Sequence, residues 1–260
     1  MALQRVVVVG SGNLAEALAQ AVAQSGAQLV QLFARNRERG PAVARLAGAP
    51  WSDDPQQLAV ADLYLLAVSD RAVAEVAEGL PIPAGAAVVH TAGSVAMDAL
   101  PARYARRGVL YPLQTFTAGR AVDFRRIPLF VEASTPVLQE ELEAFAARLS
   151  QAVHRLDSQQ RVWLHLAGVF ACNFVNAMYA AGEGIVQRAG VGFEVLKPLL
   201  AETAAKAAAA ASPRTVQTGP AVRHDTATQA RHEALLAGDP QLQAIYRLIS
   251  NEIWETSKKI

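Results

Sequence analysis

The sequence predicts an α/β protein in which a doubly wound, mainly parallel β-sheet is followed by a smaller all-α domain. Strand and helix signals alternate over the first 156 residues, and no convincing strand signal follows. The 260 residues are 52% hydrophobic and 18% charged, which is enough for a sizeable core in one large or two ordinary domains. We therefore expect a sheet domain at 1–156 and a helical domain at 157–260.

The strand signals of the first domain are short runs rich in β-branched and other apolar residues. They lie at 5–9, 28–33, 62–68, 86–91, 108–113, 128–132 and 152–156. Helical patterns separate several of them, at 14–24, 37–47, 72–79 and 135–149. This alternation implies right-handed β-α-β crossovers, and unbroken apolar runs such as VVVV suit strands that are covered on both faces.

The second domain is predicted to contain helices only, at 157–189, 193–211, 226–237 and 240–257. Asp157 followed by Gln160 is typical of a capping box at a helix start. An alanine-rich segment within 193–211 favours a helix over disorder. Small alanines allow close helix approach, either to the sheet domain or to a second copy, and our hypothesis is a homodimer formed through this domain.

A glycine-rich turn joins the first strand to the first helix. Its sequence, GSGNLA at 10–15, is a G-x-G-x-x-A pattern in the strand–turn–helix context of the dinucleotide-binding Rossmann fingerprint. The helix start that follows offers free N–H groups to phosphates. The alternative is a glycine turn that binds nothing. We expect the cofactor to contact Gly10, Ser11, Gly12, Asn13 and Leu14.

The tip of the second strand selects the dinucleotide. In NAD-binding proteins a carboxylate at this point binds the ribose hydroxyls, whereas here the residues are Arg35, Asn36 and Arg37. Guanidinium groups can bind a 2′-phosphate with paired hydrogen bonds, so these residues favour NADP over NAD. An exposed basic turn is the alternative.

Two further loops follow later strands and are rich in small polar residues. Ligands of parallel sheets sit at the carboxyl ends of the strands, where these loops lie. Ser69 and Asp70 are equally suited to cap the next helix. The cofactor contacts expected from the two loops are Val68, Ser69, Asp70, Thr91 and Ala92.

The motifs together resemble NADP-dependent reductases of the pyrroline-5-carboxylate reductase and ketopantoate reductase type. The whole chain resembles more closely a group of bacterial Rossmann-like proteins with a helical C-terminal domain of unassigned function, described as NADP oxidoreductases. YPLQTF at 111–116, HLAGVFACNFVN at 165–176 and TGPAVRHD at 218–225 carry this second resemblance. It implies the fold and an NADP cofactor. One departure is Cys172, four residues before Asn176, where related dehydrogenases place a catalytic lysine.

Hydride transfer to a carbonyl or imine needs a donor for the developing charge. The candidate catalytic residues are Ser94, His165 and Asn173, of which the last two share one face of an otherwise apolar helix. Hydrogen bonding that only fixes helix packing is the alternative for that face. The sequence thus favours an NADP-dependent oxidoreductase acting on a small carbonyl or imine metabolite; the alternative is a noncatalytic NADP-binding sensor or scaffold.

Composition argues against several other classes of protein. The net charge of +1 gives no footprint for nucleic acid, and the single cysteine excludes an intramolecular disulfide and a cysteine-based zinc site. We expect no metal site, because no ligand cluster is evident. The most apolar stretch is interrupted by Asn173 and Asn176, so we expect no membrane span and a cytoplasmic location.

Overall fold

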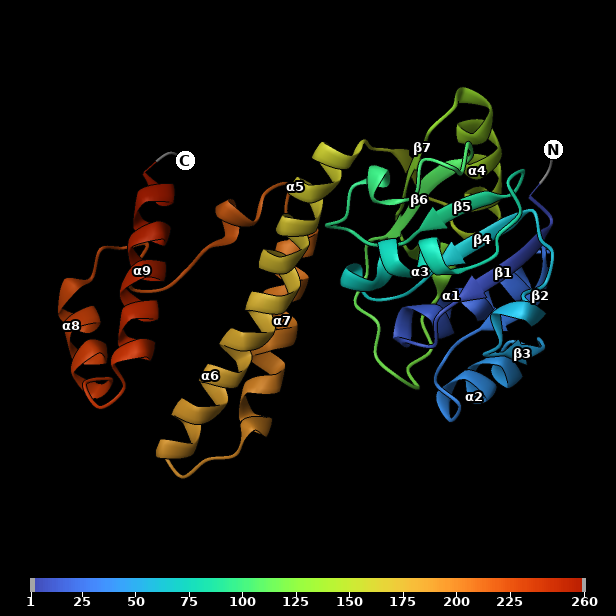
Figure 1. Cartoon of the computed structure of the whole chain (residues 1–260). Coiled ribbons are helices and arrows are strands. Elements are labelled where there is room, and N and C mark those ends of the chain that lie inside the picture. Colours follow the sequence, from blue (N-terminus) through green and yellow to red (C-terminus); the bar gives the residue numbers. More distant parts are fainter. Residues whose placement is uncertain (1–2, 259–260) are drawn as a thin grey trace. The chain divides into compact units, whose positions relative to one another are not determined.

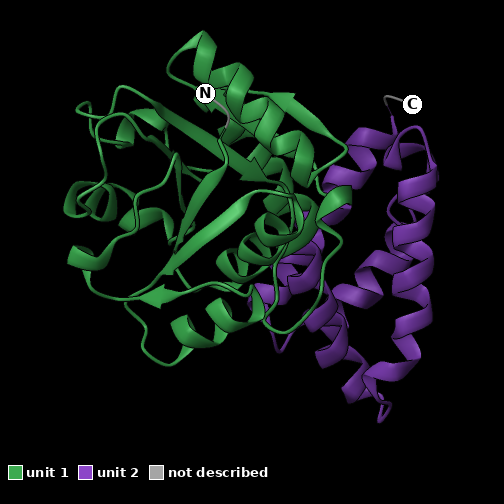
Figure 2. Ribbon diagram, turned by 90° about the vertical axis from the view of Figure 1, so that its right-hand side faces the viewer, with its two compact units in different colours: residues 1–173 green, residues 174–260 purple. Residues whose placement is uncertain are grey.

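The computed structural model describes residues 3–258, which form two compact units. The units comprise Met1–Asn173 and Phe174–Ile260 and are coloured separately in Figure 2. The predicted domain boundary at 156/157 coincides with the start of the first helix after the sheet, whereas the compact units divide further along that helical run. The division into domains 1–156 and 157–260 stays a prediction.

The N-terminal unit is built on one eight-stranded sheet with the order β3-β2-β1-β4-β5-β6-β7-β8 (Figure 1). The strands are β1 (Arg5–Val9), β2 (Gln28–Phe33), β3 (Trp51–Ser52), β4 (Leu63–Leu66), β5 (Ala87–His90), β6 (Arg107–Pro112), β7 (Leu129–Ala133) and β8 (Val153–Arg155). All neighbours pair in parallel except β6 and β7. The strand order reverses direction between β1 and β4, and ligands of such sheets bind at this switch point.

Helices cover both faces of the sheet, which confirms the predicted doubly wound fold. They are α1 (Asn13–Gln24), α2 (Arg39–Leu46), α3 (Val73–Gly79) and α4 (Pro136–Leu149). Short 3₁₀ turns lie at Pro55–Gln57, Asp70–Ala72, Met97–Ala99 and Phe124–Arg126.

Two features of the sheet were not predicted. Strand β3 has only two residues, which is too short for an alternation pattern to reveal. Strand β7 runs antiparallel to β6 because the chain between them contains a 3₁₀ turn and no crossover helix.

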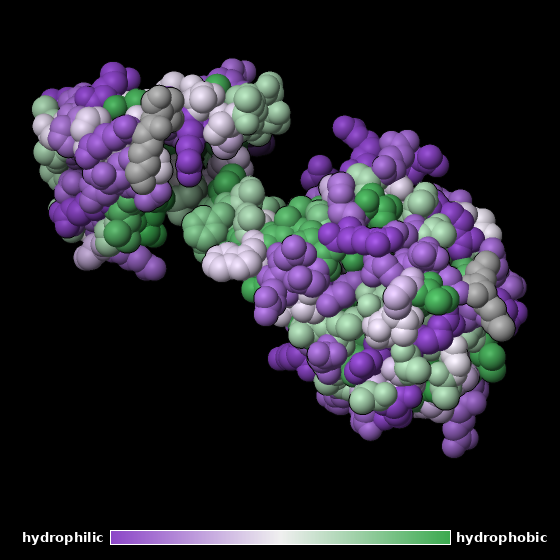
Figure 3. All heavy atoms as spheres, turned by 90° about the horizontal axis from the view of Figure 1, so that it is seen from above, coloured by the Kyte–Doolittle hydropathy of each residue, from purple (hydrophilic) through white to green (hydrophobic). Residues whose placement is uncertain are grey.

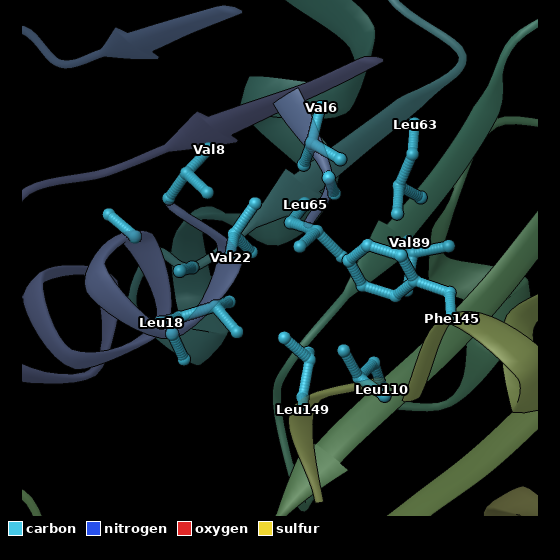
Figure 4. Close-up of a cluster of buried hydrophobic side chains, with 14 of the residues drawn as sticks. Val6, Val8, Leu18, Val22, Leu63, Leu65, Val89, Leu110, Phe145 and Leu149 are labelled. Atoms are coloured by element: carbon cyan, nitrogen blue, oxygen red, sulfur yellow. The ribbon is translucent and has the colours of Figure 1, made fainter. Parts of the chain in front are cut away.

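The alternation of side chains along β1 explains why its valine run is unbroken. Val6 and Val8 pack on one face with Leu18 of α1 and Phe145 of α4 (Figure 4), while Val7 packs in a second cluster on the other face. Every one of these valines is fully buried. A strand covered on both faces therefore needs no polar position, as the sequence indicated.

The helical run after the sheet begins as predicted. The Asp157 carboxylate accepts from the Gln160 N–H at 2.8 Å, and the Gln160 side chain accepts from the Asp157 N–H at 3.0 Å, which completes the capping box. The single helix expected at 157–189 is divided into α5 (Ser158–Gly168), a π-helical segment (Val169–Phe174) and α6 (Val175–Arg188). Periodicity alone does not reveal such a wide turn, because the apolar pattern continues through it.

The remaining elements are helical, as predicted. They are α7 (Lys197–Ala209), α8 (Thr226–Leu235) and α9 (Pro240–Ser257), with 3₁₀ turns at Phe193–Leu196 and Pro213–Val216. Hydrophobic side chains gather on the surface of the helices that follow the sheet (Figure 3), and Trp163 of α5 is 73% exposed.

One helical run in the described residues is long and apolar enough to cross a membrane. It comprises the 31 residues Ser158–Arg188, within which a window of 18 residues has a mean hydropathy of 1.3. Length and composition are weak evidence, because helices of water-soluble proteins pass the same test.

Candidate functional site

A cavity of about 700 Å³ lies at the switch point of the sheet. Residues that follow β1, β2 and β4 line it, together with the start of α1 and part of α3. Nine of the predicted cofactor contacts are brought together there: Gly10, Ser11, Gly12, Asn13, Leu14, Arg35, Asn36, Val68 and Ser69.

Gly10 makes the turn out of β1 possible. Its φ of +122° is a conformation that side-chain-bearing residues rarely adopt, and a Cβ there would lie 2.3 Å from the Ala67 carbonyl oxygen. The Gly10 N–H donates to the Phe33 carbonyl oxygen at 2.8 Å. The turn is therefore held tightly between the ends of β4 and β2.

Gly12 leaves open space in the same cavity. A Cβ at this position would meet no protein atom within 4 Å, so the protein's own packing does not require a glycine there. Gly12 is also the N-cap of α1, and no side chain caps that helix start. Uncapped N–H groups at the positive end of a helix dipole suit a phosphate group.

Charged side chains lie at the end of the cavity formed by the tip of β2. Arg35 lies 3.9 Å from Glu75, and each of these side chains is 75% exposed. Arg37 does not line the cavity; its Nε donates to Asp53, which does, at 2.5 Å. Arg35, Asp53 and Glu75 thus line the end of the cavity where an adenosine ribose would lie in a Rossmann site, and Arg37 is bonded to one of these carboxylates.

The Asn36 side chain is used for local structure. Its Oδ1 accepts from the backbone N–H groups of Glu38 and Arg39, at 3.0 and 2.8 Å, and so satisfies donors at the start of α2.

Besides Arg37, three predicted cofactor residues of the described chain lie outside this cavity. Thr91 is buried and its hydroxyl donates to the Leu66 carbonyl oxygen at 3.3 Å. Ala92 is also buried, and its N–H donates to His90 Nδ1 at 3.2 Å. Asp70 accepts a short hydrogen bond from Ser94, so that these two predicted site residues bind each other.

His90, at the end of β5, is fully buried. Burial lowers its pKa to about 4, and the nearby Arg161 acts in the same direction. The imidazole is therefore neutral at pH 7.

A second cavity, of about 620 Å³, adjoins the first, because Asn13 and Leu14 line both. Residues after β6 form one wall, and α5 with the π-helical segment forms another. The predicted catalytic residues His165 and Asn173 line this second cavity, and Ser94 does not. None of its fifteen lining residues is an aspartate, glutamate, lysine or arginine.

Tyr111 faces His165 in the second cavity. Its hydroxyl lies 3.2 Å from His165 Nδ1, and the two rings meet edge to face with centroids 6.0 Å apart. Burial raises the pKa of Tyr111, Asp70 adds to the rise, and Arg161 opposes it. A Cβ at Gly93 would lie 2.5 Å from His165 Nδ1 and 2.8 Å from the Tyr111 ring, so this glycine gives the pair its space.

Sequence reasoning named Tyr111 only as part of the YPLQTF motif and gave it no role. The signal that could have found it is the position itself: a tyrosine at the carboxyl end of a parallel-sheet strand, beside the expected cofactor loops.

A buried arginine anchors the helix that carries His165. Arg161, one turn before His165 and 1% exposed, forms a salt bridge with Glu132 of β7 and donates to the Val95 carbonyl oxygen at 2.6 Å. Ser158 donates to the same carboxylate, at 2.8 Å to its Oε2. The start of α5 is therefore tied to the sheet and to the loop after β5.

Within residues 3–258 no group of three or more histidine, cysteine, aspartate or glutamate side chains is placed to hold a metal ion.

Comparison with known proteins identifies the family. A structure of a putative NADP oxidoreductase from Bacteroides fragilis is 40% identical, with a TM-score of 0.89, and the match covers 97% of this chain and 98% of that one. The chain belongs to this NADP oxidoreductase family. The model of a family described as "NADP oxidoreductase coenzyme F420-dependent" matches residues 5–93, and that of a domain of unknown function (DUF2520) matches residues 127–253.

Two less similar structures share the fold of this chain. A protein from Thermotoga maritima is 18% identical, with a TM-score of 0.77 and 98% of both chains covered. A pyrroline-5-carboxylate reductase from Coxiella burnetii is 16% identical, with a TM-score of 0.57, covering 99% of this chain and 98% of that one. No curated protein matches. The fold and the oxidoreductase family are thus those that the sequence motifs indicated.

Proposed function

We propose that the protein is an NADP-dependent oxidoreductase that transfers a hydride between NADPH and a small carbonyl or imine compound. The observation that carries this proposal is the pair of adjoining cavities that share Asn13 and Leu14. The first cavity, of about 700 Å³, would take the dinucleotide beside the open space at Gly12, and the second, of about 620 Å³, would take a small substrate.

The residues of the first cavity fit a dinucleotide. Gly12 and the uncapped start of α1 would hold the pyrophosphate, and Val68 and Ser69 would lie along the ribose. Arg35 and Arg37 would bind a 2′-phosphate, for which both would turn from their carboxylate partners. The cofactor supplies the hydride when it is bound. NADP is also the cofactor in the name of the Bacteroides fragilis relative.

The second cavity favours an uncharged substrate. Its lining carries no residue that would pair with a carboxylate or an ammonium group, apart from the titratable His165. The π-helical segment contributes Ala171, Cys172 and Asn173 to the wall, and such segments are frequent at functional sites. His165 and Asn173 would bind the polar end of the substrate.

A noncatalytic NADP-binding sensor or scaffold is the second candidate. Cys172 favours it, because this residue lines the second cavity where related dehydrogenases carry a lysine.

One experiment separates these functions. Binding of NADPH, NADH and both oxidised forms is measured by thermal shift, and consumption of NADPH is then followed with uncharged aldehydes, ketones and cyclic imines. We expect stabilisation by NADPH and turnover of at least one compound. Stabilisation without turnover across the panel would favour the sensor, and the absence of stabilisation by every dinucleotide would refute both functions.

We also propose that the protein is cytoplasmic and that it forms a homodimer through its helices. The dimer is supported by apolar side chains that are exposed on those helices, such as Trp163 at 73% and Leu199 at 60%. Light scattering at micromolar concentration should give twice the monomer mass, and Trp163→Glu should lower it; a monomeric wild-type protein would contradict the proposal.

A further inference from the structure

Two of the titratable side chains of the second cavity are bonded to each other. Of its lining residues only Tyr111, His165 and Cys172 titrate, and the tyrosine hydroxyl and the histidine Nδ1 lie 3.2 Å apart. The two residues are 54 positions apart in sequence and come from β6 and α5. Their contact is therefore a product of the fold.

Three elements hold this pair in one geometry. Tyr111 lies on β6, in register with Phe130 of β7. His165 lies one turn after Arg161, which is buried and bonded to Glu132 and to the backbone of Val95. The loop after β5 passes close to both rings, where the missing side chain of Gly93 leaves the required space.

The direction of this hydrogen bond depends on which nitrogen of His165 carries the proton, and the direction matters for chemistry. When His165 carries its proton on Nδ1, it donates to the Tyr111 oxygen and leaves the phenolic hydrogen free to point into the cavity. The same donor would stabilise a phenolate formed after that hydrogen is given away. Burial raises the pKa of Tyr111, so the phenol stays protonated at neutral pH and holds a proton that the strongly basic oxygen or nitrogen formed by hydride transfer can take.

The other polar groups near the cavity are less suited to this role. The Ser94 hydroxyl donates to Asp70 and does not line the cavity. Asn173 lines it, but an amide is not an acid at neutral pH.

We propose that Tyr111, supported by His165, is the proton donor to the substrate in the second cavity. This proposal rests on the proposed reductase function. The substrate carbon accepts a hydride from NADPH, which is thereby oxidised, and the π electron pair of the C=O or C=N bond moves to the heteroatom. That atom takes the Tyr111 proton, and the phenolate then regains a proton from water.

Activity tests the proposal through two tyrosine variants. Tyr111→Phe removes only the hydroxyl, and Tyr246→Phe is the matched control. Tyr246 lies 2.9 Å from His232 in a similar pair within the C-terminal unit, and neither residue lines either cavity. With benzaldehyde, cyclohexanone and 1-pyrroline as probes, we expect Tyr111→Phe to lower kcat by roughly 10²–10⁴-fold. Its Kd for NADPH and the kcat of Tyr246→Phe should stay within about twofold of wild type.

A second readout does not depend on turnover. The chain has five histidines, so the ¹⁵N-imidazole signals of labelled protein can be assigned by substitution. Tyr111→Phe should shift the Nδ1 signal of His165 and leave that of His232 in place, whereas Tyr246→Phe should do the reverse.

The outcomes separate the two proposals. Turnover by wild type together with unchanged kcat in Tyr111→Phe would overturn the donor role and leave the reductase function standing. NADPH binding by wild type without reduction of any probe would overturn the reductase function and the donor role with it. If Tyr111→Phe does not fold, His165→Gln is measured instead; we expect at least a tenfold loss of kcat, and an unchanged kcat would count against the pair.

Discussion

Alanine at Gly10 should lower the stability of the fold, whereas alanine at Gly12 should lower only the affinity for NADPH, although the two glycines belong to one turn. A Cβ at Gly10 would lie 2.3 Å from a backbone oxygen of Ala67, at a φ of +122°. A Cβ at Gly12 would meet no protein atom within 4 Å, at a φ of −69°. The first change disturbs the fold, and the second changes only the space available to a ligand.

The cost at Gly10 has two parts. Strained backbone costs on the order of 1–3 kcal/mol, and overpacking against a backbone atom costs about the same. The sum of about 2–6 kcal/mol corresponds to a fall in Tm of roughly 4–24 °C for a unit of this size. At Gly12 the loss of a favourable N-cap residue and the gain in backbone rigidity each amount to about 1 kcal/mol or less and oppose each other.

Thermal denaturation with and without NADPH measures both effects. At a concentration of 100 Kd, NADPH should stabilise wild type by about 2.7 kcal/mol, or roughly 5–11 °C. Gly12→Ala should keep the wild-type Tm without ligand and lose this increase, because its methyl group occupies space left for the pyrophosphate. A Gly12→Ala protein that folds normally and binds NADPH like wild type would refute the assignment of the cavity.

Three further predictions concern charge. Arg35→Ala should raise the Kd for NADPH about tenfold and leave the Kd for NADH unchanged, because a hydrogen bond to a charged group contributes about 1.5–3 kcal/mol at most and Arg35 is exposed. Calorimetry checks this prediction, with Arg45→Ala as the control, and equal effects on both cofactors would contradict it. His90 has a pKa of about 4 in the folded protein and an ordinary value of 6.5, so as the pH falls the unfolded chain takes up a proton before the folded protein does. The free energy of unfolding should therefore fall by about 3 kcal/mol as the pH drops from 6.5 to 4. Urea unfolding should show a smaller fall in His90→Asn, which keeps an acceptor for the Ala92 N–H; an equal fall in both proteins would argue against His90. Carboxylate-bearing analogues should be reduced with a kcat/KM at least about tenfold lower than that of uncharged compounds, because the second cavity offers no lysine or arginine to pair with a carboxylate. Steady-state kinetics on matched pairs of compounds measures this difference, and a preference for the acids would reverse the expected substrate class.

Much of the fold could be predicted because the information is local. The β1 valines, the GSGNLA turn and the Asp157–Gln160 capping box each lie within a few residues, and the structure contains all three. Strand β3 escaped prediction because two residues form no pattern, and the π-helical segment because its apolar sequence is that of an ordinary helix.

The candidate site was less predictable because side chains choose partners across the fold. Asp70 and Ser94 were assigned to different roles from sequence, yet they are 24 residues apart and bonded to each other. Arg37 binds Asp53, a residue that no motif singled out. The contact between Tyr111 and His165 depends on how β6 meets α5, which local patterns do not encode.

Gly93 constrains which residues can occupy positions 111 and 165 in this family. Any side chain there would press on both the Tyr111 and His165 rings, so a relative that changes residue 93 must also alter one of its two neighbours in space. We therefore expect positions 93, 111 and 165 to vary together among homologous sequences, and lineages that lose this glycine should also lose the tyrosine–histidine pair. Such covariation would mark the branch of the family at which the chemistry of the second cavity changed.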